Sequence, residues 1–201
     1  KFKQPALCKS FTVQQELAVG PDLLTFSGDK LLGSVQAGVI LGKAEIVQKM
    51  RNHPIYRALR LDKVSIGLLE TTLEAYLDLK SLPEVVPTVQ LLELTGKEIL
   101  ENVKNFVKKL KFKENTSWKY KIVKTNSLTG GGALPESPLD STALVLSHPN
   151  WSSKKLQEWL RSQPIPVIVR IHNEQIWLDF RTILPQDNTE LLSTLSKLIS
   201  E

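Results

Sequence analysis

The sequence predicts an α/β segment that is followed by a small α+β domain, and three observations indicate this order. Short apolar runs alternate with helical periods over residues 1–60, as they do at the edge of an α/β sheet. A long helical period then ends at Pro83 and Pro87, which punctuate the chain. Further helices and alternating strands run on to the C-terminus. We therefore expect a large-domain portion at residues 1–60, a connecting helix and linker at 61–84, and a small domain at 85–201.

The first part predicts two strands around a loop. Residues 23–26 form one largely apolar run, and residues 39–41 form the next. Helices are expected on either side of these strands, at residues 13–19 and 43–52. Two strands are too few for an α/β domain, so we expect the rest of the sheet to lie upstream in a longer protein.

The later elements follow from caps and periodicity. A long helix is expected over residues 62–80, and Asp62 is a good N-cap residue for it. Thr95 and Glu98 form a capping box in front of an apolar helical stripe. The remaining expected elements are strands at residues 120–122, 142–146, 167–171 and 176–180, a helix capped by Ser152 or Ser153, and a last helix over residues 191–199. Helices on one face of a small antiparallel sheet would bury these apolar faces.

The composition favours a reduced, cytoplasmic protein outside the membrane. A single cysteine, Cys8, excludes an internal disulfide. No apolar run reaches the ~18 residues that a membrane span requires, and no secretory signal opens the chain. The net charge of +5 is compatible with an RNA partner and also with an ordinary basic protein.

Lys30 points most directly to chemistry. It lies just after an apolar run, in a loop with Gly28 and Gly33 on either side. If its ammonium loses water and a proton there, the neutral amine can attack an aldehyde to form a Schiff base. The flanking glycines let the backbone lie close to a ligand. Pyridoxal phosphate (PLP) needs a lysine of this kind, whereas most loop lysines are simply solvated.

Five further residues are candidates for binding an anion. Ser27, Gly28 and Asp29 offer a hydroxyl and free backbone N–H groups that suit a phosphate, although Ser-Gly-Asp is also a good turn sequence. Arg57 and Arg60 are three residues apart, so a helix would place both guanidinium groups on one side. Two such groups form a strong anion site, and a solvated surface pair is the alternative.

Two other patterns argue against further kinds of site. The glycine run at residues 130–132 lacks the Lys-Ser/Thr of a phosphate-binding loop, so nucleotide binding is not expected. His53, His148 and His172 have no metal-ligand spacing, so no metal site is expected.

The remaining cations have simple structural interpretations. Arg170 and Arg181 are expected on the solvated face of a hairpin. A basic cluster on one predicted helix could contact RNA, although an exposed helix face is the simpler interpretation. The cluster comprises Lys104, Lys108, Lys109, Lys111 and Lys113.

Five motifs in one order resemble the bacterial selenocysteine synthase family, the L-seryl-tRNA(Sec) selenium transferases. They are Ser27-Gly-Asp-Lys30-Leu-Leu-Gly, Gln36-Ala-Gly38, Arg57-Ala-Leu-Arg60-Leu-Asp-Lys63, Gly130-Gly-Gly-Ala-Leu-Pro135 and Leu178-Asp-Phe-Arg-Thr182. The resemblance runs from about residue 12 to the end and corresponds to the C-terminal part of a family protein. Two departures stand out: Ser34-Val35 where the family has Gly-Pro, and Val169 where it has glycine.

The resemblance implies the C-terminal part of a fold-type I PLP transferase, in which residues 1–60 are the edge of the large domain. It implies that Lys30 carries PLP as the catalytic lysine. Ser27, Gly28 and Asp29 would then lie near the cofactor phosphate.

The activity implied by the resemblance converts seryl-tRNA(Sec) to selenocysteinyl-tRNA(Sec). The seryl group would lose its hydroxyl on PLP, and selenium from selenophosphate would then add. Arg57 and Arg60 would hold the phosphate. The family also implies a large homo-oligomer.

Parts of such a site would lie upstream, in the missing N-terminal part of the same enzyme. They are the aspartate for the pyridine nitrogen, the residue that stacks on the ring, and a tRNA-binding domain. We therefore expect these 201 residues alone to hold PLP weakly or not at all and not to turn over. Two other interpretations stay open: another PLP-dependent lyase of similar fold, and a catalytically silent module for tRNA binding or oligomerisation.

Overall fold

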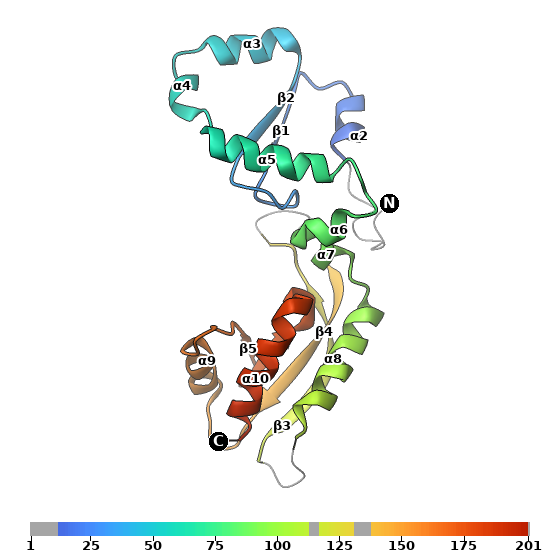
Figure 1. The fold of residues 1–201 in the computed structure, drawn as a ribbon, viewed down its shortest axis with the longest axis vertical. Helices are drawn as coiled ribbons and strands as arrows, with labels where there is room; N and C mark the ends of the chain where they lie inside the picture. The colour runs from blue at the N-terminus through green and yellow to red at the C-terminus, as the bar shows by residue number, and fades with distance from the viewer. Residues whose placement is uncertain (1–11, 113–116, 131–137, 201) are drawn as a thin grey trace. The chain divides into compact units, whose positions relative to one another are not determined.

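The structure is a computed structural model that describes residues 12–112, 117–130 and 138–200 and has a mixed α/β fold (Figure 1). The chain folds into two compact units, each with its own helices and sheet. Lys1–Glu93 with Thr129–Ser137 forms the first unit, and Leu94–Leu128 with Pro138–Glu201 forms the second. None of the helices in the described ranges is long and apolar enough to cross a membrane.

The first unit combines a two-stranded antiparallel sheet with several helices. Its elements are α2 (Val13–Ala18), β1 (Leu23–Ser27), β2 (Gly38–Gly42), α3 (Ala44–Asn52), α4 (Tyr56–Leu59), α5 (Lys63–Ala75), α6 (Leu82–Val85) and α7 (Pro87–Glu93). Thr12 and Gln15 form a capping box at α2. Asp62 caps α5 by accepting hydrogen bonds from the backbone N–H groups of Val64 and Ser65, which confirms the expected start of that helix.

Helix α5 ends well before residue 80, where the sequence pattern placed its end. The Asp78 carboxylate accepts hydrogen bonds from the Lys80 backbone N–H at 3.0 Å and from the Ser81 hydroxyl at 2.9 Å. Local bonds of this kind compete with the helical ladder. Two short helices follow instead of an open linker. Pro83 and Pro87 lie in their first turns, where no backbone N–H is needed.

Strands β1 and β2 pair antiparallel, from Leu23 opposite Gly42 to Ser27 opposite Gly38. The strand–loop–strand order expected around Lys30 is therefore confirmed. The pattern succeeded here because both apolar runs are short and are bounded by turn residues.

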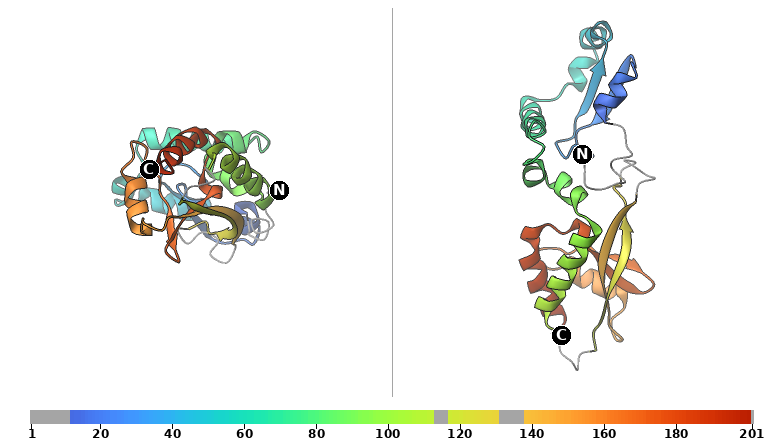
Figure 2. Two further views of the ribbon diagram at one scale, coloured as in Figure 1. Left: turned by 90° about the horizontal axis from the view of Figure 1, so that it is seen from below. Right: turned by 90° about the vertical axis from the view of Figure 1, so that its right-hand side faces the viewer.

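The second unit is a small α+β domain with an antiparallel sheet in the order β3-β4-β6-β5. Its elements are α8 (Gly96–Leu110), β3 (Lys119–Ser127), β4 (Leu139–Ser147), α9 (Ser153–Arg161), β5 (Arg170–His172), β6 (Gln175–Asp179), η1 (Phe180–Thr182), η2 (Pro185–Asp187) and α10 (Asn188–Leu198). Helices α8 and α10 lie on one face of the sheet (Figure 2). The hairpin β5–β6 turns at Asn173 and Glu174, whose positive φ values of 48° and 55° fit a type I′ turn.

The core of the second unit lies between the sheet and its helices. It includes Ile99, Val103, Phe106, Leu144, Leu146, Leu156, Ile176, Leu178, Leu191 and Leu195. The expected stripe of α8 is thus confirmed. Complete burial of one such side chain contributes about 1.5–3 kcal/mol, so this face fixes the helix on the sheet.

Arg181 is only 3% exposed, so its expected place on a solvated sheet face is wrong. Strand β6 ends at Asp179, and the following 3-10 turn directs the Arg181 side chain inward. Its guanidinium donates to the backbone carbonyls of Leu94, at 2.8 Å, and Asp140. Burial lowers the pKa of Arg181, while the charges of the two aspartates oppose that shift. Arg170 instead remains half exposed and pairs with Asp179 at 3.1 Å.

Candidate functional site

The loop between β1 and β2 carries Lys30 on a well-bonded backbone. The Gly28 N–H donates to the Ala37 carbonyl at 2.8 Å, and the Ser34 N–H donates to the Gly28 carbonyl at 2.8 Å. A Cβ at Gly28 would lie 2.7 Å from the Val35 carbonyl oxygen. Glycine is therefore required at this position by the packing of the loop itself, whatever it binds.

The same loop is anchored to helices of the first unit. Tyr76 follows α5, and its hydroxyl donates a hydrogen bond to the Leu32 carbonyl at 3.0 Å. Burial raises the pKa of Tyr76. Gly33 has a φ of +73°, and a Cβ there would lie 2.8 Å from Cγ1 of Val86. These contacts fix the loop backbone, while the Lys30 side chain lies outside them.

Lys30 keeps its contact with water among the described residues, and its role as the cofactor lysine stays a prediction. Its side chain is 49% exposed, and its ammonium lies 3.1 Å from the Asp29 carboxylate. The hydrogen bond from Lys30 holds the pKa of Asp29 below its usual range, and the Ser27 hydroxyl acts in the same direction. Ser27, Asp29 and Lys30 thus form one small polar cluster at the end of β1.

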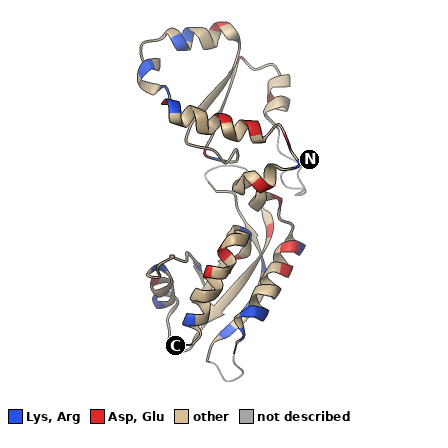
Figure 3. Cartoon of the chain, viewed as in Figure 1, with Lys and Arg blue, Asp and Glu red and all other residues tan. Residues whose placement is uncertain are grey.

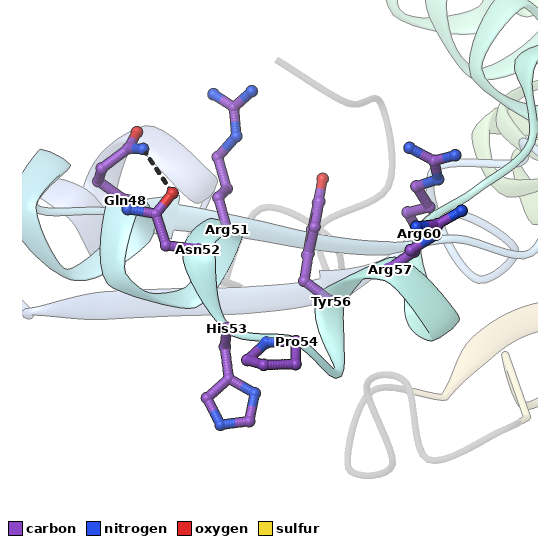
Figure 4. A pocket seen from close by; sticks show the side chains of 8 residues that line it. All are labelled: Gln48, Arg51, Asn52, His53, Pro54, Tyr56, Arg57 and Arg60. Carbon is purple, nitrogen blue, oxygen red and sulfur yellow. Dashed lines mark hydrogen bonds between the residues drawn. The ribbon is translucent and has the colours of Figure 1, made fainter.

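Arg57 and Arg60 line an open pocket of about 740 Å³ in the first unit (Figure 4). Its lining comprises Gln48, Arg51, Asn52, His53, Pro54, Tyr56, Arg57 and Arg60. These residues come from the end of α3, the following turn and α4. The two arginines share one pocket, although α4 ends before Arg60 and the Arg60 backbone is extended.

Arg51 is a third arginine of this pocket, and sequence reasoning does not single it out. It lies in the last turn of α3, where the helix dipole already favours a cation without any ligand. Its side chain extends to the same side of the segment as Tyr56 and Arg60, whereas His53 extends to the other side (Figure 4). The grouping depends on the turn at Pro54, which the spacing of the arginines does not reveal.

The pocket has the chemistry of an anion site. Among the described residues, its lining includes three guanidinium groups and no carboxylate. Within the described ranges none of these arginines forms an ion pair. Planar guanidinium groups bind phosphate-like anions through paired hydrogen bonds. Lys30 and its neighbours Ser27, Gly28 and Asp29 do not line this pocket, so the candidate residues form two separate groups.

The other candidates have structural roles or fall outside the described residues. Gly130 has a φ of +69°, and the rest of the motif, residues 131–135, lies outside them. The His148 ring is tilted against the Trp118 ring with centroids 4.8 Å apart, and the His172 ring packs edge-on against Trp177 with centroids 5.6 Å apart. In the part of the chain that the structure describes, no three His, Cys, Asp or Glu side chains gather as a metal site.

The chain belongs to the L-seryl-tRNA selenium transferase (SelA) family, which it matches over residues 1–184. It is 43% identical over 178 residues to the L-seryl-tRNA(Sec) selenium transferase of Aliarcobacter butzleri, which covers 89% of this chain and 38% of that protein. The enzyme of the same name from Geotalea daltonii is 36% identical over 192 residues, which cover 96% of this chain and 42% of that protein. The enzyme from Haemophilus influenzae is 37% identical over 198 residues, which cover 98% of this chain and 42% of that protein. The family expected from the motifs is confirmed.

Two comparisons set the limits of this finding. The chain spans only 38% to 42% of the length of these relatives. Among solved structures it is similar to apo CalE6, a methionine gamma lyase from Micromonospora echinospora, with a TM-score of 0.36 and 13% identity over 93% of this chain and 53% of that chain. A likeness this slight does not bear on the fold or the function of this chain.

Proposed function

We propose that this chain is the C-terminal part of a PLP-dependent enzyme that converts seryl-tRNA(Sec) to selenocysteinyl-tRNA(Sec) with selenophosphate in the cytoplasm. In this proposal, residues 1–60 form the edge of a fold-type I large domain in a homo-oligomer. The observation that carries it is the fixed loop around Lys30 in a member of the selenium transferase family.

The residues around Lys30 suit PLP in their chemistry. Lys30 offers a half-exposed primary amine that an aldehyde can reach. The Ser27 hydroxyl and the loop N–H groups around Gly28 suit the cofactor phosphate. Asp29 is itself an anion, so it would act on the Lys30 amine rather than on that phosphate. When bound, PLP supplies an electron sink that weakens bonds at the α-carbon of an amino acid.

Lys30 would also carry protons in the reaction. A lysine amine can take up and deliver a proton at a reacting carbon. The Asp29 carboxylate, 3.1 Å from the Lys30 ammonium, would orient the side chain for this role.

Arg57 and Arg60, assisted by Arg51, would bind the phosphate of selenophosphate. Their support is the pocket that they share, in which the described lining residues include no carboxylate. The remaining PLP ligands and a tRNA-binding domain would lie in the part of the family protein that this chain does not cover. We accordingly propose that the chain alone does not turn over.

A chimera tests the proposal. This chain replaces the matching segment of the Aliarcobacter butzleri enzyme, and conversion of seryl-tRNA(Sec) is measured. We expect conversion by the chimera, complete loss with Lys30→Ala, and a fall of about 100-fold with Arg57→Ala, the scale of removing one preorganised charged contact. Lys43→Ala is the matched control, because Lys43 is also an exposed loop lysine paired with an aspartate. Conversion that survives Lys30→Ala would contradict the assigned role.

A catalytically silent module for tRNA binding or oligomerisation is the second candidate. The half exposure of Lys30 and the exposed lysines of α8 favour it. A folded, assembled chimera without conversion, together with tRNA binding by this chain in the absence of PLP, would support that reading. Elimination from a free amino acid by the chimera would instead support another PLP-dependent lyase.

A further inference from the structure

The second unit concentrates lysines at one end. Three come from the end of α8, two from the start of β3 and two from the start of α9. These seven, which we call the basic end, are Lys108, Lys109, Lys111, Lys119, Lys121, Lys154 and Lys155. Along α8, the two glutamates lie toward its start together with Lys97, whereas Lys108 and Lys109 lie in its last turn, where Figure 3 shows the helix blue.

Ring contacts join the three segments that supply these lysines. Phe112, just after α8, stacks on Tyr120 of β3 with ring centroids 4.5 Å apart. The ring centroid of Trp118, just before β3, lies 6.5 Å from that of Trp151, which precedes α9. Lys155 places its ammonium 4.2 Å from the centroid of the Trp151 ring. The end of α8, the start of β3 and the start of α9 therefore meet at one end of the unit.

The fold accounts for only part of this charge. Lys108 and Lys109 lie in the last turn of α8, where the helix dipole favours cations. Strand β3 is an edge strand, where lysines such as Lys119 discourage pairing with another sheet. Lys154 and Lys155 have neither explanation, because they lie in the first turn of α9, where the dipole disfavours a cation.

The lysines of the basic end are exposed, and within the described ranges none of the seven forms an ion pair. The Glu174 carboxylate lies at this end, but it accepts a hydrogen bond from the Ser153 hydroxyl at 3.0 Å. Like charges gathered in this way repel one another and attract anions. An extended anionic partner would offset the repulsion.

We propose that the basic end binds the phosphate backbone of a folded RNA. Lysine ammonium groups are flexible point charges that suit a row of phosphates, and these lysines are spread over three elements rather than converging on one small anion. The proposal rests on the proposed function for the identity of the RNA, an aminoacyl-tRNA. It adds a contact surface on the second unit, apart from the Lys30 loop and the arginine pocket.

The test measures binding of the 201-residue chain, without PLP, to a tRNA(Sec) transcript by fluorescence anisotropy over a salt series. The variant combines Lys108→Gln, Lys119→Gln and Lys154→Gln, one change in each segment. We expect affinity to fall by about tenfold or more and the salt slope to fall by about three, one for each lost phosphate contact. The control is Lys97→Gln, an exposed lysine at the other end of α8, which should change affinity less than about twofold.

Three results would overturn this proposal. They are an unchanged salt slope in the triple variant, an equal loss in Lys97→Gln, and equally tight binding of polyglutamate, which would indicate an acidic protein surface as the partner. The outcome is separable from that of the proposed function. RNA binding through the basic end in a chain whose Lys30 has no role in conversion would uphold this surface and reject the PLP enzyme. Conversion by a chimera that carries the triple variant, with unaltered RNA affinity, would uphold the PLP enzyme and reject this surface.

Discussion

The Lys30 ammonium donates a hydrogen bond to the Asp29 carboxylate at 3.1 Å. The amine that would meet a cofactor is therefore held by the residue immediately before it, on a loop whose backbone is fixed by Gly28, Gly33 and Tyr76. Both side chains are partly exposed, so this contact is a charge-assisted hydrogen bond in contact with water rather than a buried ion pair.

Replacing Lys30 with methionine should raise the pKa of Asp29 toward its ordinary value of about 3.9. The hydrogen bond from Lys30 is the largest cause of the lowered pKa of Asp29. A lowered carboxylate pKa stabilises the folded chain above the ordinary pKa, and this contribution is lost as the pH falls through the folded value. NMR titration of the Asp29 carboxyl carbon measures the shift. Lys43→Met is the control, and an Asp29 pKa that does not respond to Lys30→Met would show that the pair does not form.

Gly33→Ala should destabilise the first unit by about 1–3 kcal/mol. Gly33 has a φ of +73°, and its new Cβ would lie 2.8 Å from Val86. Gly38→Ala is the matched control, because a Cβ at that strand position meets nothing within 4 Å. Urea unfolding followed by near-UV absorption or fluorescence compares the two variants. Equal stability of the two would mean that the loop is not packed on α6 as described.

Arg51→Ala should weaken the binding of inorganic phosphate by about as much as Arg57→Ala or Arg60→Ala. Each variant removes one of three guanidinium groups from a single pocket, and a charge-assisted hydrogen bond contributes about 1.5–3 kcal/mol. Calorimetry at low ionic strength gives the affinities, with Arg161→Ala on α9 as the control. Unchanged phosphate affinity in Arg51→Ala would exclude Arg51 from the anion site.

Arg181→Gln should destabilise the second unit by about 1–3 kcal/mol for each buried carbonyl that loses its donor. One carbonyl belongs to Leu94, which precedes α8, and the other belongs to Asp140 in β4. Arg170→Gln, which breaks an exposed pair with Asp179, should cost less than about 1 kcal/mol. Chemical denaturation of the two variants makes the comparison, and a larger cost for Arg170→Gln would reverse the assigned roles.

Local sequence signals predicted the elements that depend on neighbouring residues. The β1–loop–β2 order, the Asp62 cap, the Thr95 capping box and the turn at Asn173 and Glu174 all follow from short-range patterns. The family was also predictable, because its motifs are contiguous segments in a fixed order.

Features that depend on distant contacts were not predictable. The burial of Arg181 could not be predicted, because the two carbonyls that accept its hydrogen bonds lie 87 and 41 residues away along the chain. Arg51 and Arg57 line the same pocket because the chain turns between them, and the hydrophobic pattern of the sequence does not reveal that turn. The half exposure of the Lys30 side chain is likewise a property of the folded loop and its surroundings that local sequence patterns do not reveal.

The central claim, that Lys30 is the amine that takes PLP, is tested most directly by labelling. The chimera that carries this chain in the Aliarcobacter butzleri enzyme is loaded with PLP, reduced with borohydride, digested and mapped by mass spectrometry. Lys43 is the internal standard, because it is similarly exposed and also paired with an aspartate. The account predicts that the cofactor mass accumulates on Lys30 well above its level on Lys43. Equal labelling of the two lysines would contradict it.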